Sequence, residues 1–386
     1  MRLAKVLLIV LLSFWSEVLG FRDNSWGSFG LSNIGWYSIL QISFTLISVV
    51  LIFRNSLFKI NVNILYIVLF FTLIFSFLLS GESLSSQFTN LIKIKFVLQL
   101  PVILYSINKL STEYILKIFN KFGLIAVYAL LIQFYFYFTD NTIVGNTTIF
   151  VEATLEGRGL RILSPLTIFI IFNLINLLLK FKNNFNFVTL FNLILTFTAI
   201  VFIGHRNIIV LSLILILIVN GKIILSMLAS VIYIGISSLT ISGIIDDSNI
   251  LNFSSLVRLE HYSNTLVWLS NNWYGCFYDW TVYDSQMLLD SLTSNEFVKA
   301  PTGDSGWLNL ILIYGIPGLI FVILIIRSSV LNLYAFRGKY LQLILFIFSC
   351  SIMSLFMALG LIGVPSGFFI TILLIGLSKT NEISNS

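Results

Sequence analysis

The sequence carries little charge for its length. Only 10% of its 386 residues are Asp, Glu, Lys or Arg, whereas a soluble domain carries about 25%. Hydrophobic residues make up 58% of the chain, and its mean hydropathy is +1.00. This composition excludes a soluble globular protein, a disordered chain, a coiled coil and collagen. No polar stretch is long enough for a nucleic-acid-binding module, so a multi-spanning membrane protein remains.

Cysteine, histidine and nucleotide-binding motifs are also scarce. The two cysteines, Cys276 and Cys350, fall in different predicted layers and give neither a disulfide nor a metal framework. There is no P-loop, no D-x-D pair and no H-E-x-x-H site. An enzyme of this sequence is therefore expected to work without a metal or other cofactor. The middle of each predicted span also lacks Asp and Glu, which argues against a proton- or sodium-coupled transporter.

What the sequence has in abundance is long apolar segments. Runs of this kind predict membrane-spanning helices, because a chain in lipid must satisfy its own backbone hydrogen bonds. We predict an all-α, polytopic membrane protein that forms a single membrane domain over residues 1–386. The first segment has the charges of a signal peptide but no clear cleavage site, and we expect it to be retained. The twelve predicted spans are 7–19, 36–53, 62–79, 91–107, 122–138, 162–179, 187–203, 207–220, 223–241, 307–326, 340–359 and 363–377.

Lys and Arg in the short loops predict the orientation. If the N-terminus is cytoplasmic, every predicted inside loop contains a base, and only Glu113 and Glu382 join the bases there. Both termini are then cytoplasmic in a multi-pass protein of the membrane. Fourteen of the 22 bases fall inside: Arg2, Lys5, Arg54, Lys59, Lys109, Lys117, Lys121, Lys180, Lys182, Lys222, Arg327, Arg337, Lys339 and Lys379.

One outer loop, residues 244–306 between the ninth and tenth spans, is much larger than the others. It contains Trp268, Trp273 and Trp280, whose rings could stack on sugars or form a membrane-interface belt. Within it, residues 254–270 have apolar positions near helical spacing, which predicts an interfacial helix.

The remaining eight bases fall at the outer side, where the positive-inside bias disfavours them. They are Arg22, Lys93, Lys95, Arg158, Arg161, Arg206, Arg258 and Lys299. Any one could extend to lipid headgroups. For four arginines in three separate outer segments, a shared anionic ligand is the better account, because the planar guanidinium matches phosphate oxygens and stays charged. We therefore expect a lipid-linked phosphate or pyrophosphate to bind Arg158, Arg161, Arg206 and Arg258.

Four segments resemble those of the O-antigen polymerase and ligase superfamily. The segment 156–165, EGRGLRILSP, resembles its R-x-x-G-x-x-x-x-P stretch, and Gly204-His205-Arg206 resembles its G-S-R hairpin tip. Arg258 followed by W…N…G at 268–275 resembles the R…W…N-P-x-x-G of its large periplasmic loop, with Trp273 in place of the proline. The fourth, DSGWLNLILIYGIPG at 304–318, resembles H-N-x-Y-L-x-x-L-x-x-x-G-x-P-G. The resemblance covers residues 150–320.

The resemblance implies a GT-C-like fold, as in O-antigen ligases, and a metal-independent inverting glycosyl transfer. The donor is a glycan chain on undecaprenyl pyrophosphate, and the acceptor is one repeat unit on the same lipid. The product is O-antigen or capsular polysaccharide at the outer face of the bacterial cytoplasmic membrane. A polysaccharide chain-length regulator is an implied partner. Ligases have His where this chain has Asp304, so the difference favours a polymerase.

Roles for individual residues follow from this chemistry. The four arginines would neutralise the leaving pyrophosphate, and Asp304 would accept the proton of the acceptor hydroxyl, with His261 as the rival base. Asp304 could instead only cap the next helix, and His261 could be an ordinary interfacial residue. Gly315, Pro317 and Gly318 are expected to shape helix packing. Two other functions stay open: a ligase of the same superfamily, and a lipid-linked oligosaccharide flippase.

Overall fold

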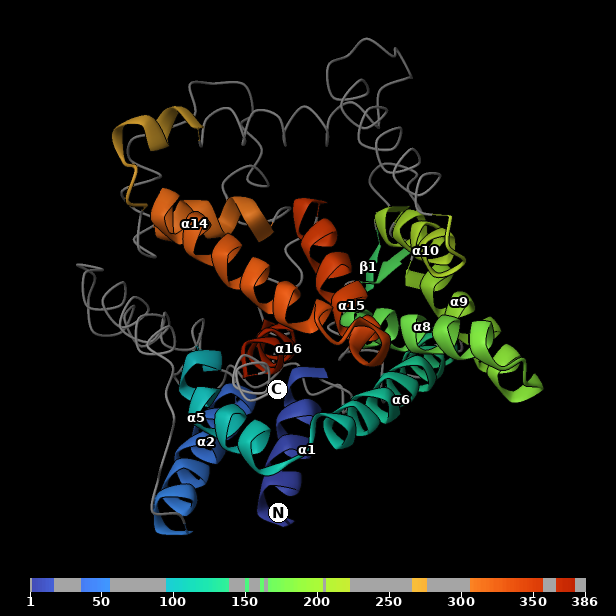
Figure 1. Cartoon of the computed structure of the whole chain (residues 1–386), viewed down its shortest axis with the longest axis horizontal. Coiled ribbons are helices and arrows are strands. Elements are labelled where there is room, and N and C mark those ends of the chain that lie inside the picture. The colour runs from blue at the N-terminus through green and yellow to red at the C-terminus, as the bar shows by residue number, and fades with distance from the viewer. Residues whose placement is uncertain are drawn as a thin grey trace.

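The described part of the chain is helical apart from one short strand pair and a few turns (Figure 1). The computed structural model describes residues 2–16, 36–55, 95–138, 150–152, 160–162, 166–203, 206–222, 266–275, 306–356 and 366–378. Its helices are α1 (Arg2–Ser16), α2 (Trp36–Asn55), α5 (Lys95–Lys109), α6 (Thr112–Phe138), α8 (Leu166–Asn183), α9 (Phe187–Ile203), α10 (Arg206–Val219), α14 (Gly306–Tyr334), α15 (Arg337–Phe356) and α16 (Ser366–Ser378). A further short helix covers residues 266–271.

Ten of the predicted spans coincide with described helices. The agreement is closest for α9, which has the predicted bounds 187–203. The predicted spans 62–79 and 223–241 lie outside the described residues, so the total of twelve stays a prediction. Of the interfacial helix predicted over 254–270, only its last five residues are described, and they are helical.

The length of the apolar helices is compatible with a membrane protein. Among the described residues, three helical stretches are long and apolar enough to cross a bilayer: Thr112–Ile132, Leu166–Asn183 and Tyr314–Tyr334. Five shorter apolar helical stretches accompany them: Ser43–Ile52, Phe187–Ile203, Ile208–Val219, Gly338–Ser354 and Gly367–Ser378.

The sixth predicted span begins later than expected. Residues 160–162 do not open a helix; they form β2 (Leu160–Ile162), which pairs antiparallel with β1 (Phe150–Glu152). Pro165 explains part of the difference, because the residue before a proline is disfavoured in helical geometry. The helix α8 therefore starts at Leu166, and Arg161 lies in a strand instead of at the helix entrance.

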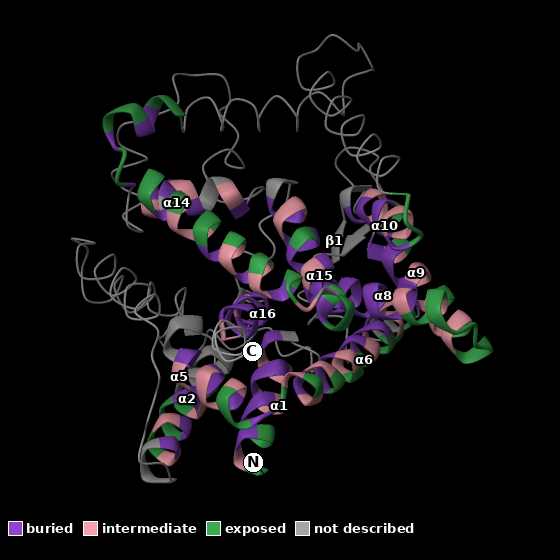
Figure 2. Ribbon diagram, in the orientation of Figure 1, coloured by how far each residue is buried: buried purple, intermediate pink, exposed green. Residues whose placement is uncertain are grey.

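Helix α8 is the centre of the bundle. Its residues 166–178 are all buried (Figure 2), and it packs against α6, α9, α10 and α15. Phe172 on α8 contacts Phe119 of α6, Phe346 of α15 and Phe368 of α16, with ring centroids 5.9, 5.1 and 5.4 Å apart. In lipid this van der Waals packing replaces the hydrophobic effect as the main force between helices.

Small and polar residues also hold the helices together. A Cβ on Gly123 of α6 would lie 2.8 Å from the Asn173 Cβ of α8, so glycine permits this close approach. Asn173 Nδ2 donates to Thr196 Oγ1 of α9 at 3.1 Å. Gln342 Nε2 of α15 donates to Asn120 Oδ1 of α6 at 2.6 Å. These directional contacts fix the position of each helix along its neighbours, which apolar packing alone specifies less well.

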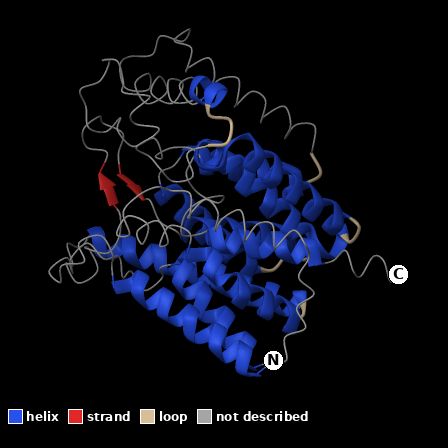
Figure 3. Ribbon diagram, turned by 90° about the vertical axis from the view of Figure 1, so that its left-hand side faces the viewer, coloured by secondary structure: helices blue, strands red, loops and turns tan. Residues whose placement is uncertain are grey.

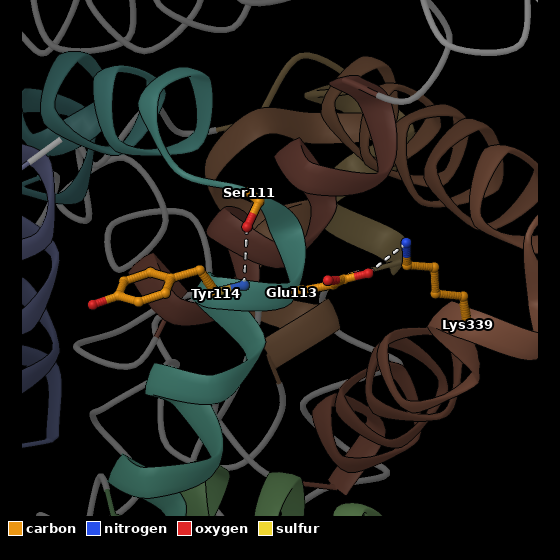
Figure 4. Close-up of polar contacts among 4 residues, drawn as sticks. All are labelled: Ser111, Glu113, Tyr114 and Lys339. Atoms are coloured by element: carbon orange, nitrogen blue, oxygen red, sulfur yellow. Dashed lines mark hydrogen bonds and ion pairs between the residues drawn. The ribbon is translucent and has the colours of Figure 1, made fainter.

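Two of the basic residues predicted at the cytoplasmic side, Lys5 and Lys339, lie in contacts between helix ends. Lys339 binds Glu113 at 2.6 Å, and Ser111 Oγ accepts from the Tyr114 amide at 3.3 Å and so caps α6 (Figure 4). Lys5 Nζ of α1 lies 5.4 Å from the centre of the same Tyr114 ring. One end of α1, α6 and α15 is thereby gathered together. Figure 3 shows the strand pair at the opposite end of the bundle from the N-terminus.

Candidate functional site

The predicted site residues lie mostly outside the described part of the chain. Asp304, His261, Arg158 and Arg258 are outside it altogether. Arg161 is described as the middle residue of β2, and Arg206 as the first residue of α10, but only through their backbones. The assignment of these six residues to catalysis and pyrophosphate binding therefore stays a prediction. The segments that flank them are described, and their contacts are informative.

Strand β2, which lies in the first resembling segment, contacts the helix that precedes the second. In the strand pair, Arg161 is the register partner of Val151. Strand β2 contacts α9, and α9 ends at Ile203, three residues before Arg206. The strand that contains Arg161 of the first segment thus packs against the helix that leads to the second segment.

The fourth segment contains a break in α14. Gly315 has φ 63° and ψ −163°, a backbone region that is essentially restricted to glycine. Two residues later, Pro317 has no N–H to give to the preceding turn. Pro317 lies in the first turn of the restarted helix, where backbone amides have no helical acceptor, so the missing N–H costs no helical hydrogen bond. The sequence Gly-Ile-Pro-Gly therefore separates α14 into a short first part and a long second part.

The third segment closes this break. The amide of Ile316, left without a helical acceptor, donates to the carbonyl of Trp273 at 2.9 Å. The approach is so close that a Cβ on Gly315 would lie 2.1 Å from the Trp273 oxygen and 2.4 Å from the Tyr274 carbonyl carbon. Glycine at 315 is thus required twice, by its backbone angles and by the loop that packs on it. In Figure 1 the short helix 266–271, in gold, lies beside the bend of α14.

Residues 266–275, which we term the docking segment, have a well-defined internal structure. Trp268 is buried, and its carbonyl accepts from both the amide and the Nδ2 of buried Asn272, at 3.0 and 3.2 Å. Tyr274 Oη donates to Asn272 Oδ1 at 3.3 Å. The turn ends at Gly275, which has φ 85° and donates to the Asn272 carbonyl at 2.9 Å. The W, N and G of the third segment thus build the turn that presents the Trp273 carbonyl to α14.

The first part of α14 is held at its other end by α15. Trp307 Nε1 donates to the Ser351 carbonyl at 2.9 Å. Gly306, the first residue of α14, is buried, and Asp304 precedes it by two positions. The short part of α14 is thus fixed between the docking segment and α15, directly after the proposed base.

Sequence reasoning anticipated some of this and missed some. The structure confirms that Gly315 shapes packing, and it shows that the partner is a loop instead of another helix. The strand pair and the polar contacts inside the bundle were not predicted. A polar residue within an apolar run, such as Asn173, was the available signal for the latter. The docking segment and the strand pair lie on opposite sides of the view in Figure 1.

Neither a protein-family model nor a curated protein matches this chain. The resemblance to O-antigen polymerases and ligases accordingly rests on the four short segments and their order in the sequence.

Proposed function

We propose that this protein polymerises lipid-linked oligosaccharide repeat units into O-antigen or capsular polysaccharide. The substrates are glycans on undecaprenyl pyrophosphate, and the reaction takes place at the outer face of the bacterial cytoplasmic membrane. The apolar helices, the absence of a nucleotide-binding motif and the surplus of outer arginines all support a membrane enzyme that uses a lipid pyrophosphate donor.

The observation that carries the proposal is the contact between the third and fourth resembling segments. The two are separated by about thirty residues of sequence, and each is short. The backbone of Trp273 nevertheless meets the backbone of Gly315 and Ile316, with a hydrogen bond of 2.9 Å. The two segments that resemble the family are thus adjacent in the fold, as segments of one site would be.

The proposed reaction is a single displacement. A hydroxyl oxygen of the acceptor sugar attacks the anomeric carbon of the donor and forms the new glycosidic bond. The bond from that carbon to the pyrophosphate oxygen breaks, and the lipid pyrophosphate leaves with the electron pair. Asp304 accepts the hydroxyl proton as the bond forms, and His261 is the second candidate for that role. Arg158, Arg161, Arg206 and Arg258 stabilise the charge that builds on the pyrophosphate.

The proposed orientation places the N- and C-termini in the cytoplasm and the 244–306 loop outside. The contacts of Lys5, Glu113 and Lys339 support it, because these residues come from segments predicted on the same side. Lys182 adds a third contact of this kind by donating to the Val219 carbonyl at the end of α10, at 2.6 Å.

The first test is deletion of the gene in a strain that makes a polymeric surface glycan. We expect single repeat units on the lipid core instead of a ladder of lengths on a gel. Polymer of normal length would refute the proposal. Loss of all sugar from the core would instead favour a ligase or a flippase, since either is needed before any repeat reaches the core.

The second test replaces one arginine at a time. Arg206→Ala and Arg258→Ala should each lower polymer formation by about 10²–10³-fold, the usual cost of losing a group that stabilises developing charge. The matched control is Arg22→Ala, which removes another predicted outer base that is in none of the four segments. Equal activity of all three variants, at equal membrane levels, would dismiss the pyrophosphate site.

The third test concerns the proton acceptor and the metal. Asp304→Asn should abolish polymerisation while lipid-linked substrate still binds, whereas an N-cap would keep most of its function as Asn. A parallel His261→Ala variant separates the two candidates.

Purified protein should stay active in EDTA, and activity that required added divalent metal would contradict the metal-free mechanism.

A further inference from the structure

The docking segment has an exposed apolar surface. Leu266 and Val267 are 67% and 64% exposed, and Trp273 and Tyr274 are 58% and 46% exposed. Trp268, Leu269 and Asn272 of the same ten residues are buried. The segment thus turns one set of side chains into the protein and leaves two aliphatic and two aromatic side chains uncovered. The Trp273 and Tyr274 rings meet edge to face, with centroids 6.1 Å apart and an interplanar angle of 82°.

The docking segment lies at one end of a membrane-length helix. The apolar stretch Tyr314–Tyr334 has 21 residues, which at about 1.5 Å per residue spans about 31 Å, close to the thickness of the hydrocarbon core. Ile316, whose amide donates to Trp273, is at the beginning of this stretch. A bilayer-spanning placement of this stretch would put the aromatic pair at the level where the hydrocarbon core meets the headgroups.

The uncovered surface continues along α14. Ile316, Ile320, Ile323 and Leu324 are all exposed. Their spacing of four, seven and eight residues from Ile316 places them on one face of the helix. This apolar stripe starts directly at the residue bonded to Trp273. A face of this kind on a membrane-length helix is suited to acyl chains, and the aromatic pair is at its end.

We propose that the docking segment is an interfacial anchor and that its partner is the phospholipid headgroup layer. Trp273 and Tyr274 place their rings among the headgroups, where amphipathic aromatic side chains are enriched. Leu266 and Val267 enter the upper acyl region beside them. The anchor fixes the depth of the α14 break through the Ile316–Trp273 bond, and so holds the first part of α14 at the membrane surface. This inference does not depend on the proposed reaction.

The test measures the depth of one tryptophan. Full-length protein is placed in nanodiscs of phosphatidylethanolamine and phosphatidylglycerol whose acyl chains are brominated either near the carboxyl end or near the methyl end. Bromine quenches indole fluorescence on contact. The signal of Trp273 is the difference between the natural protein, which has seven tryptophans, and the Trp273→Phe variant. Trp15→Phe is the comparison, because Trp15 is buried and bonded to Gln99 at 2.7 Å.

We expect Trp273 to lose most of its emission to lipids brominated near the carboxyl end and little to those brominated near the methyl end. Water-soluble acrylamide should quench it weakly, and Trp15 should be insensitive to all three quenchers. If Trp273→Phe does not accumulate, Tyr274→Trp adds a reporter at the neighbouring position, with the same expected order of quenching. Strong quenching by acrylamide with none by either lipid would overturn the anchor. Protection of such a water-exposed Trp273 by added oligosaccharide would identify it as a sugar-stacking residue instead.

Discussion

Replacement of Gly315 by alanine should release the docking segment from α14. The backbone angles at Gly315, φ 63° and ψ −163°, cost a non-glycine residue about 1–3 kcal/mol. The new Cβ would lie 2.1 Å from the Trp273 oxygen, so the loop must also move away. The bond from Ile316 to Trp273 is then lost, at about 0.5–1.5 kcal/mol.

Together these terms favour the released state by about 2–4 kcal/mol, an increase of about 30- to 1,000-fold in its population. Hydrogen–deuterium exchange read by mass spectrometry measures this directly. Exchange should accelerate by that factor at the Ile316 amide and over residues 266–275, while the buried α8 should exchange as before.

Two other glycines provide matched controls. Gly221 has φ 79° but nothing within 4 Å of an added Cβ, so Gly221→Ala adds strain without a clash. Gly338→Ala adds neither. Both should leave exchange at residues 266–275 and Ile316 unchanged. The reasoning would be refuted if Gly315→Ala behaved like Gly338→Ala, because the contact would then not hold the segment.

Two further predictions concern stability. Gly376→Ala should lower the free energy of unfolding by about 1–3 kcal/mol, because a Cβ there would lie 2.0 Å from the Ser329 Oγ and 3.0 Å from the Ser329 backbone oxygen. Thermal unfolding in detergent measures the effect, with Gly338→Ala as the control. An unchanged unfolding midpoint would contradict the close packing of α14 and α16. Glu113→Gln should change the free energy of unfolding by less than about 1 kcal/mol, since the Glu113 and Lys339 side chains are 68% and 55% exposed. A loss of stability larger than that of Gly376→Ala would contradict this prediction.

The helix positions were largely predictable, and the errors at α6 and α14 have a common cause. The predicted spans were runs of apolar residues, so these two spans were bounded at a charged residue. Helix α6 starts at Thr112 instead of 122, because Lys117 and Lys121 lie exposed on its surface and do not interrupt the helix. Helix α14 likewise continues past Arg327 to Tyr334. A charged side chain at a helix end can reach water while its backbone stays helical.

The sequence predicted the candidate site as a set of segments and gave no arrangement for them. The residues at 268–275 and 304–318 resemble two segments of one superfamily, but nothing in them indicated that the Trp273 carbonyl would accept a hydrogen bond from the Ile316 amide. The break at Gly315 is similar: glycine and proline in a span permit a kink, yet a helix would have been compatible with the same letters. The partner that makes the break necessary is the backbone of a distant loop.

The sequence by itself predicted a helical membrane protein, where most helices lie, and which arginines and acids are candidates for chemistry. These features depend on local composition, so each segment can be assigned without knowledge of the others. The tertiary structure decided which segments meet: the central place of α8, the pairing of Arg161 with Val151, and the docking of residues 266–275 on the break in α14. Such contacts join backbone groups far apart in sequence, and backbone groups are the same in every residue, so no local pattern specifies them.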